Sequence, residues 1–153
     1  MDNWINNLAR KSKETMNALS NSDERFNTEH RLKTMRGEEF WDRLVELLKD
    51  YAKDHNARAE AEILGVTPLG PYRYQVYAQW SPDRHKRVPV SYAPDRRWIE
   101  WGFPNDMIHI HGYLLELVGD HSAVAVVSAG HPAKYQPEDI AKEIIQFVLD
   151  YRG

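Results

Sequence analysis

Residues 107–118, which read MIHIHGYLLELV, form the longest nearly uncharged run of the chain and decide the fold. Side chains alternate between the two faces of a strand. The run therefore divides into two sets: Met107, His109, His111 and Tyr113 against Ile108, Ile110 and Leu114. Twelve residues is about twice the usual strand length of ~6, so we expect a bulge at Gly112. An inserted residue there would bring Glu116 onto the face of His109 and His111.

The run ends at Gly119-Asp120, a pair favoured in tight hairpin turns, and the apolar segment 123–128 (AVAVVS) follows. A two-residue loop would place His111 opposite Ser128, whereas a four-residue loop would place it opposite Gly130. An apolar hairpin without strict polar alternation indicates the buried centre of a sheet.

The strongest helix signal covers residues 38–57, where apolar residues recur every three or four positions. A final helix is expected from Pro137-Glu138-Asp139, because proline and acidic residues favour a first helical turn. We expect one core in which these helices pack on the central strand. Its predicted members are Trp41, Leu44, Leu48, Ile110, Leu114, Ile144 and Val148.

Residues 2–36 are polar and carry only thin apolar stripes. The segment Asn21-Ser22-Asp23 predicts a break and a new N-cap, and hence two short helices. Residues 1–37 are then either an arm that docks on a partner or a segment that drapes over the domain formed by residues 38–153.

Between the strong helix and the central hairpin, residues 72–80 (YRYQVYAQW) alternate as a half-buried strand does. Pro82-Asp83-Arg84 and Pro94-Asp95-Arg96 predict two similar turns. Pro89 cannot donate to a ladder, so residues 88–92 are expected at an edge or as an irregular strand. The order predicts an α+β fold, with an antiparallel five- to six-stranded sheet packed by an N-terminal helical region and a C-terminal helix.

Composition narrows the functional classes. The 153 residues contain no cysteine, which excludes disulfides, thiolate metal sites and a cysteine nucleophile. No run approaches the ~18 apolar residues of a membrane-spanning helix and no signal peptide is apparent, so a cytoplasmic location is expected. The net charge of −3 makes nucleic acid an unexpected partner, and only residues 63–104, with six basic and three acidic groups, keep that option open.

Four residues are candidate metal ligands: His109, His111, Glu116 and His131. Histidines two apart on a strand point the same way, and a carboxylate would complete a set for one divalent metal ion. These residues support the alternative function, a metal-dependent enzyme or a small-ligand binder. The competing interpretation is that His109 and His111 are partly buried strand residues hydrogen-bonded to neighbours.

The main candidate is an aromatic and basic sheet surface, because tryptophan, tyrosine and arginine are enriched at binding hot spots. Its predicted members are Arg73, Tyr77, Trp80, Arg84, Arg87, Arg96, Arg97, Trp98 and Trp101. No motif for catalysis or for a cofactor accompanies it. The sequence therefore favours a small non-enzymatic interaction protein, of the immunity, chaperone or adaptor type, that binds another protein; the oligomeric state stays open.

Overall fold

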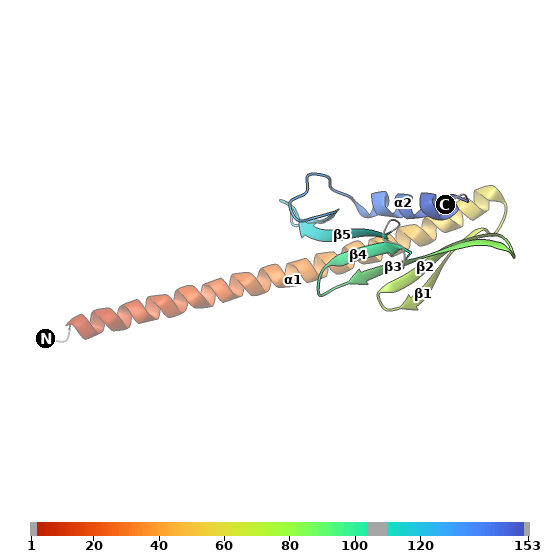
Figure 1. The fold of residues 1–153 in the computed structure, drawn as a ribbon. Coiled ribbons are helices and arrows are strands. Elements are labelled where there is room, and N and C mark those ends of the chain that lie inside the picture. Colours follow the sequence, from red (N-terminus) through yellow and green to blue (C-terminus); the bar gives the residue numbers. More distant parts are fainter. Residues whose placement is uncertain (1–2, 104–109, 152–153) are drawn as a thin grey trace. The chain divides into compact units, whose positions relative to one another are not determined.

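The computed structural model describes residues 3–103 and 110–151. Within them the chain forms two helices and six strands, in the order α1 Asn3–Ala59, β1 Leu64–Gly70, β2 Arg73–Ser81, β3 Arg84–Ala93, β4 Trp98–Gly102, β5 Ile110–Leu117, β6 Ala123–Val126 and α2 Pro137–Leu149. Each strand pairs antiparallel with the next along the chain, which makes one meander (Figure 1). The predicted α+β class is confirmed.

α1 is a single helix of 57 residues, so the predicted break at Asn21-Ser22-Asp23 is wrong. Such residues cap a helix only where the backbone leaves it, and inside a helix each costs no more than about 0.7 kcal/mol relative to alanine. Nearby, the hydroxyls of Thr15 and Thr28 donate to the carbonyls of Lys11 and Glu24, four residues earlier. Polar side chains here are satisfied by the helix itself and do not end it.

The chain divides into two compact units, residues 1–33 and 34–153, and the boundary falls inside α1. In the first unit every residue from Asn3 to Arg31 is exposed. In the second unit α1 continues through Gly37, which is buried, and a Cβ at this position would meet the hydroxyl of Tyr92. Glycine in mid-helix is explained by this close approach.

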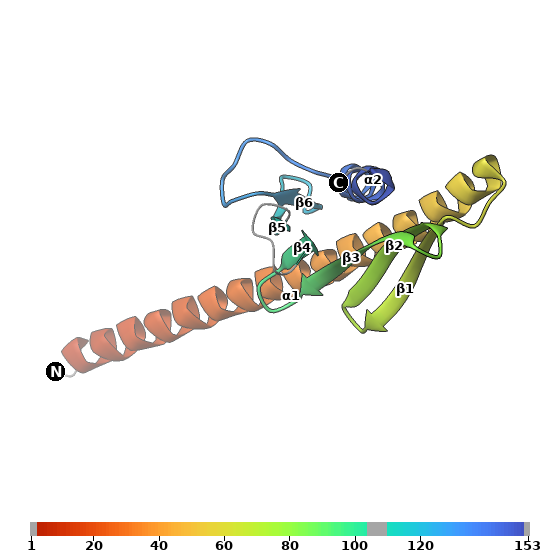
Figure 2. The same ribbon diagram turned by 45° about the vertical axis from the view of Figure 1, so that its right-hand side comes forward.

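The core of the second unit lies between one face of the sheet and the two helices. From α1 it takes Trp41, Leu44 and Leu48, and from α2 Ile144 and Val148, all at most 2% exposed, as predicted. The sheet contributes alternate residues of each strand and is curved (Figure 2). Its core-facing members include Leu64, Val76, Ala78, Val88, Val90, Tyr92, Ile99, Trp101, Tyr113 and Leu115.

The prediction of which central-strand residues face the core is wrong. Tyr113 and Leu115 are buried in the core, whereas Ile110 and Leu114 are only partly buried and project from the opposite face. β4 pairs with β5 from Trp98 opposite Leu114 to Gly102 opposite Ile110 without a register shift, so Gly112 forms no bulge. The central run is apolar on both faces, so its sequence did not distinguish the two.

The β5–β6 hairpin has neither of the expected loop lengths. Leu117 pairs with Ala123, and Val118 N–H donates to Ser122 over 3.0 Å, which leaves the three residues Gly119, Asp120 and His121 in the loop. His121 takes the left-handed conformation with φ 64°, the usual last position of a three-residue hairpin loop. The ladder ends at Leu114 opposite Val126, so His111 has no partner on β6.

β3 lies inside the sheet, between β2 and β4, so the expectation of an edge strand around Pro89 is wrong. Tyr92 N–H donates to Tyr72 of the β2 side over 2.9 Å, and by alternation the nitrogen of Pro89 faces β4. The β3–β4 ladder begins only at Val90, opposite Trp101. Pro89 therefore lies just outside the β3–β4 ladder, so its lack of an N–H group removes no hydrogen bond to β4.

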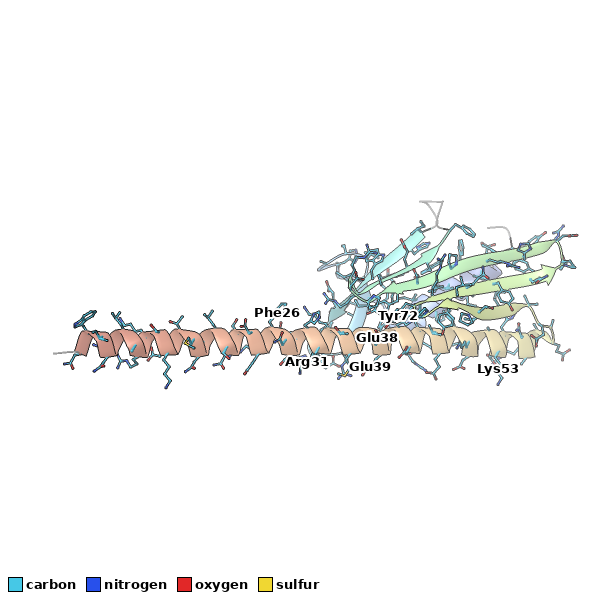
Figure 3. The ribbon with its side chains drawn as sticks, turned by 90° about the horizontal axis from the view of Figure 1, so that it is seen from below. Phe26, Arg31, Glu38, Glu39, Lys53 and Tyr72 are labelled. Carbon is cyan, nitrogen blue, oxygen red and sulfur yellow. The ribbon has the colours of Figure 1, made fainter. Side chains whose placement is uncertain are left out.

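Side-chain hydrogen bonds tie α1 to the sheet and cap α2 in the second unit. Tyr72 donates to Glu38 of α1 over 2.6 Å (Figure 3). Asn56 accepts from Leu64 N–H at 2.9 Å and donates to the carbonyl of the same residue at 2.7 Å, which ties the end of α1 to β1. At α2, Asp139 accepts from Gln136 N–H at 2.8 Å.

In the parts of the chain that the structure describes, no helix is long and apolar enough to cross a membrane.

Candidate functional site

The candidate site is built around the hairpin that joins β2 to β3. Ser81 pairs with Arg84, so Pro82 and Asp83 form the two-residue turn that the sequence predicts. The register shifts between Gln79 and Ser81, and such a bulge bends a strand and re-aims its side chains. The hairpin thus carries a basic run, residues 84–87, directly after a sharp turn.

A pocket of about 680 Å³ lies at this hairpin. It combines three aromatic residues with four consecutive basic ones, and Asp83 is the single carboxylate among the described residues that line it: Trp80, Asp83, Arg84, His85, Lys86, Arg87, Phe103 and Tyr151. We call these residues the hairpin pocket. Its positive and aromatic lining favours a ligand that is acidic and partly apolar.

The aromatic wall of the hairpin pocket joins two distant parts of the chain. Trp80 from β2 and Tyr151, which follows α2, meet edge to face with ring centroids 5.6 Å apart. The guanidinium carbon of Arg84 lies 5.2 Å from the centroid of the Tyr151 ring. This contact places the cation of Arg84 against an aromatic face, which attracts it.

Lys86 positions the pocket. Its ammonium group donates to the carbonyls of Phe147 at 2.7 Å and of Asp150 at 3.1 Å, and only 9% of the residue is exposed. Desolvation lowers the pKa of Lys86, and the charge of Asp150 opposes this shift. A cation at the carboxyl end of α2 complements the helix dipole. Lys86 therefore fixes the end of α2, and with it the start of the segment that carries Tyr151.

The structure distributes the nine predicted binding residues over more than one surface. Trp80, Arg84 and Arg87 line the hairpin pocket, but Arg87 pairs with Tyr77 and so starts from the face of the sheet away from the helices. Arg96 and Arg97 lie in the turn between β3 and β4. The others divide by strand parity: Trp101 is on the core face and 3% exposed, whereas Arg73, Tyr77 and Trp98 are on the face away from the helices.

Two aromatic residues on that outer face cover glycines. A side chain at Gly65 would meet the Tyr77 ring, and one at Gly112 would meet the Trp98 ring. Aromatic rings that lie over strand glycines replace the packing that those glycines lack. Tyr77 and Trp98 thus have a structural role in the sheet in addition to any part in binding.

The structure does not bring the candidate metal ligands that it describes into one site. His109 lies outside them, with Met107 and Ile108. His111 is on the core face of β5 and stacks on Trp101 with centroids 4.2 Å apart, whereas the uninterrupted register leaves Glu116 on the opposite face, so its predicted placement beside His111 is wrong. Glu116 accepts instead from Gly130 N–H at 3.2 Å, and His131 accepts from Ala133 N–H at 3.2 Å. No group of three His, Asp or Glu residues within residues 3–103 and 110–151 could hold a metal ion.

A second pocket, of about 500 Å³, lies beside His111. There the Tyr113 hydroxyl donates to Glu143 of α2 over 2.7 Å. Burial, followed by this hydrogen bond, raises the pKa of Tyr113. The Trp101 indole nitrogen is buried without a hydrogen-bond partner among the described groups. The pocket therefore offers a buried indole N–H beside Tyr113 and a tyrosine whose pKa is raised.

The nine predicted binding residues leave out five members of the hairpin pocket: Asp83, His85, Lys86, Phe103 and Tyr151. Sequence reasoning also missed the burial of Lys86. The spacing of Tyr151 from Ile144 and Val148 fits the apolar face of the last helix, and no pattern in the sequence indicates that Tyr151 meets Trp80. Lys86 lies two residues before Val88 and four before Val90, so it shares their face of β3, and this was the one available indication that its side chain faces the core.

No protein-family model, curated protein or solved structure matches the chain.

Proposed function

We propose that the protein is a non-enzymatic interaction module that binds an acidic segment of another protein in the hairpin pocket. The observation that carries this proposal is the gathering of Trp80 and Arg84, two residues of the predicted binding surface, beside Tyr151 at one concave site that Arg87 also lines. Binding energy in protein interfaces concentrates on such aromatic and arginine side chains.

The lining favours carboxylates. Arginine forms forked hydrogen bonds to carboxylates, and the rings of Trp80 and Tyr151 supply apolar area for the neighbouring parts of a peptide. A nucleic acid would need a longer basic track, since each phosphate contact requires its own cation and the chain as a whole carries a net charge of −3. An acidic peptide therefore fits the pocket better than a phosphate backbone does.

The test is a titration of the full chain with a polyglutamate peptide, followed by Trp fluorescence and by calorimetry. We expect saturable binding that weakens by about tenfold in the Arg84→Ala/Arg87→Ala double variant. A matched control is Lys53→Ala/Arg58→Ala, which removes the same charge from exposed positions on α1 and should leave the affinity unchanged.

Equal loss of affinity in both double variants would show that attraction to net charge alone is responsible, and would contradict the proposal. The same titration with a single-stranded oligodeoxythymidylate distinguishes the other class of partner. Tighter binding of the oligonucleotide than of polyglutamate, sensitive to Arg84→Ala/Arg87→Ala, would replace a protein partner by a nucleic acid.

A second candidate is binding of a small ligand, with or without a metal ion, in the pocket beside His111. It is supported by the pocket of about 500 Å³ and by the buried indole nitrogen of Trp101. Elemental analysis of untagged protein separates the two versions. Stoichiometric metal that disappears in both His109→Ala and His111→Ala would favour the metal-dependent alternative over the interaction module.

A further inference from the structure

The first unit carries an apolar stripe on an exposed helix. Six large apolar side chains between residues 4 and 26 are each at least 49% exposed: Trp4, Ile5, Leu8, Met16, Leu19 and Phe26. At about 100° per residue they fall within an arc of roughly 120° of the helix surface. Ser12, Thr15, Ser22 and Asp23 lie in the same arc and interrupt the stripe. A row of exposed apolar side chains along one helix face is typical of a helix that packs against a partner.

The charges along the same segment divide it into two halves of opposite sign. Residues 3–16 carry Arg10, Lys11 and Lys13 against Glu14, which gives 3 − 1 = +2. Residues 17–30 carry one basic residue and three acidic ones, which gives 1 − 3 = −2; these are Arg25, Asp23, Glu24 and Glu29. Two copies of the segment therefore attract each other when they run antiparallel, and repel in each half when they run parallel.

The apolar residues agree with the same antiparallel alignment. If Leu8 of one helix lies opposite Phe26 of the other, Met16 comes within one position of Leu19, and by symmetry each contact occurs twice. In this register Lys11 lies at the level of Asp23, both near the borders of the stripe, whereas Arg10 and Glu24 project from the other side of the helix. The stripe and the opposite charges of the two halves thus both favour an antiparallel pair of identical segments.

We propose that residues 4–30 pair with the same residues of a second chain as an antiparallel helical dimer. With Leu8 opposite Phe26, residues 4–30 of the two chains overlap, and these 27 residues correspond to about 40 Å of helix at 1.5 Å per residue. The pair covers the part of the stripe from Leu8 to Phe26 in both chains, and it brings the basic half of each helix against the acidic half of the other.

The first experiment measures the mass of the full chain by sedimentation equilibrium over a wide concentration range. We expect a dimer, and we expect Leu19→Glu to raise its dissociation constant at least about a hundredfold, because each dimer then contains two carboxylates in the apolar seam. The matched control is Asn17→Glu, which adds the same charge at an exposed position on the other side of the helix and should leave most of the dimer intact. A monomer at all concentrations, or a dimer insensitive to Leu19→Glu, would overturn the proposal.

The second experiment tests the orientation and exploits the absence of cysteine from the chain. In the proposed register Ser12 of one chain faces Ser22 of the other. A mixture of Ser12→Cys and Ser22→Cys chains should form mixed disulfides on mild oxidation, and each variant alone should form few. Efficient cross-linking of each variant with itself would indicate a parallel pair and contradict the antiparallel arrangement.

Discussion

The ammonium nitrogen of Lys86 in β3 lies 2.7 Å from the carbonyl oxygen of Phe147 in α2 and 3.9 Å from the centroid of the Phe147 ring. Hydrogen bonds from a charged donor contribute about 1.5 to 3 kcal/mol, from which the cost of burying the ammonium is subtracted. We therefore expect Lys86→Met to lower the free energy of unfolding by about 1 kcal/mol and to loosen the last turn of α2.

The amide of Asp150, which donates to the carbonyls of Gln146 and Phe147, is the local reporter. Its hydrogen exchange should accelerate in Lys86→Met. Lys142→Met, an exposed change in the same helix, serves as the control and should leave that exchange rate as it is. Unchanged exchange at Asp150 in both variants would mean that Lys86 does not hold the end of α2.

Two adjacent leucines in β5 should respond differently to truncation. Leu115 faces the core and is 3% exposed, whereas Leu114 lies on the other face and is only partly buried. Leu115→Ala should cost about 2 to 5 kcal/mol, as buried leucines do, and Leu114→Ala clearly less. Chemical denaturation of both variants measures the difference, and the reverse order would mean that the strand faces the other way.

Gly37 is a position where alanine should destabilise a helix. Glycine to alanine normally stabilises a helix interior by about 0.5 to 1 kcal/mol, but here the new methyl group would meet the Tyr92 hydroxyl. We expect Gly37→Ala to cost about 1 to 3 kcal/mol, the usual range for overpacking. The control, Ser22→Ala on the exposed part of α1, should be neutral or slightly stabilising.

A double-mutant cycle tests the cause assigned to Gly37. Tyr92→Phe removes the hydroxyl, so the cost of Gly37→Ala should shrink when it is measured in the Tyr92→Phe background. If the cost is the same in both backgrounds, another neighbour of Gly37 is responsible.

The protein should lose stability in alkaline solution. Burial, followed by the charge of Glu38, raises the pKa of Tyr92 to about 12, and burial likewise raises the pKa of Tyr113. A tyrosine whose pKa is higher in the folded than in the unfolded protein contributes stability below the unfolded value of about 10. That contribution is lost as the pH rises from about 10 to about 12.

The measurement is the denaturant midpoint between pH about 8 and about 11. Tyr92→Phe should flatten the alkaline decline, whereas Tyr151→Phe, at a residue that is 54% exposed, should retain it. A decline of equal steepness in wild type and Tyr92→Phe would show that this hydroxyl does not drive the loss.

The fold was predictable wherever one face of an element differed from the other. The apolar faces around Leu44 and Ile144 have clear helical periodicity, and both residues are fully buried. The run 107–118 lacks such a contrast, because leucines and isoleucines occupy both of its faces, and its orientation came out reversed. At Asn21-Ser22-Asp23 a local capping preference was outweighed by the continuous helix on either side.

The candidate site was predictable in its residue types and less so in its geometry. Trp80, Arg84 and Arg87 come from one hairpin, so their proximity follows from local sequence. Tyr151 reaches the same pocket through α2, and no local pattern carries that information. Trp101, which the sequence placed on the binding surface, is buried because the parity of β4 is fixed by its pairing with Val90 of β3.

The continuity of α1 has a consequence for how its first unit becomes ordered. Forming the first turn of a helix fixes several residues for a single hydrogen bond, whereas each further residue adds one bond of its own. The turns around Leu44 and Leu48 are secured by the core, so they serve as a nucleus already formed. The helix can then grow from Thr34 toward the N-terminus by propagation alone, which spares this polar segment the least favourable step in making a helix.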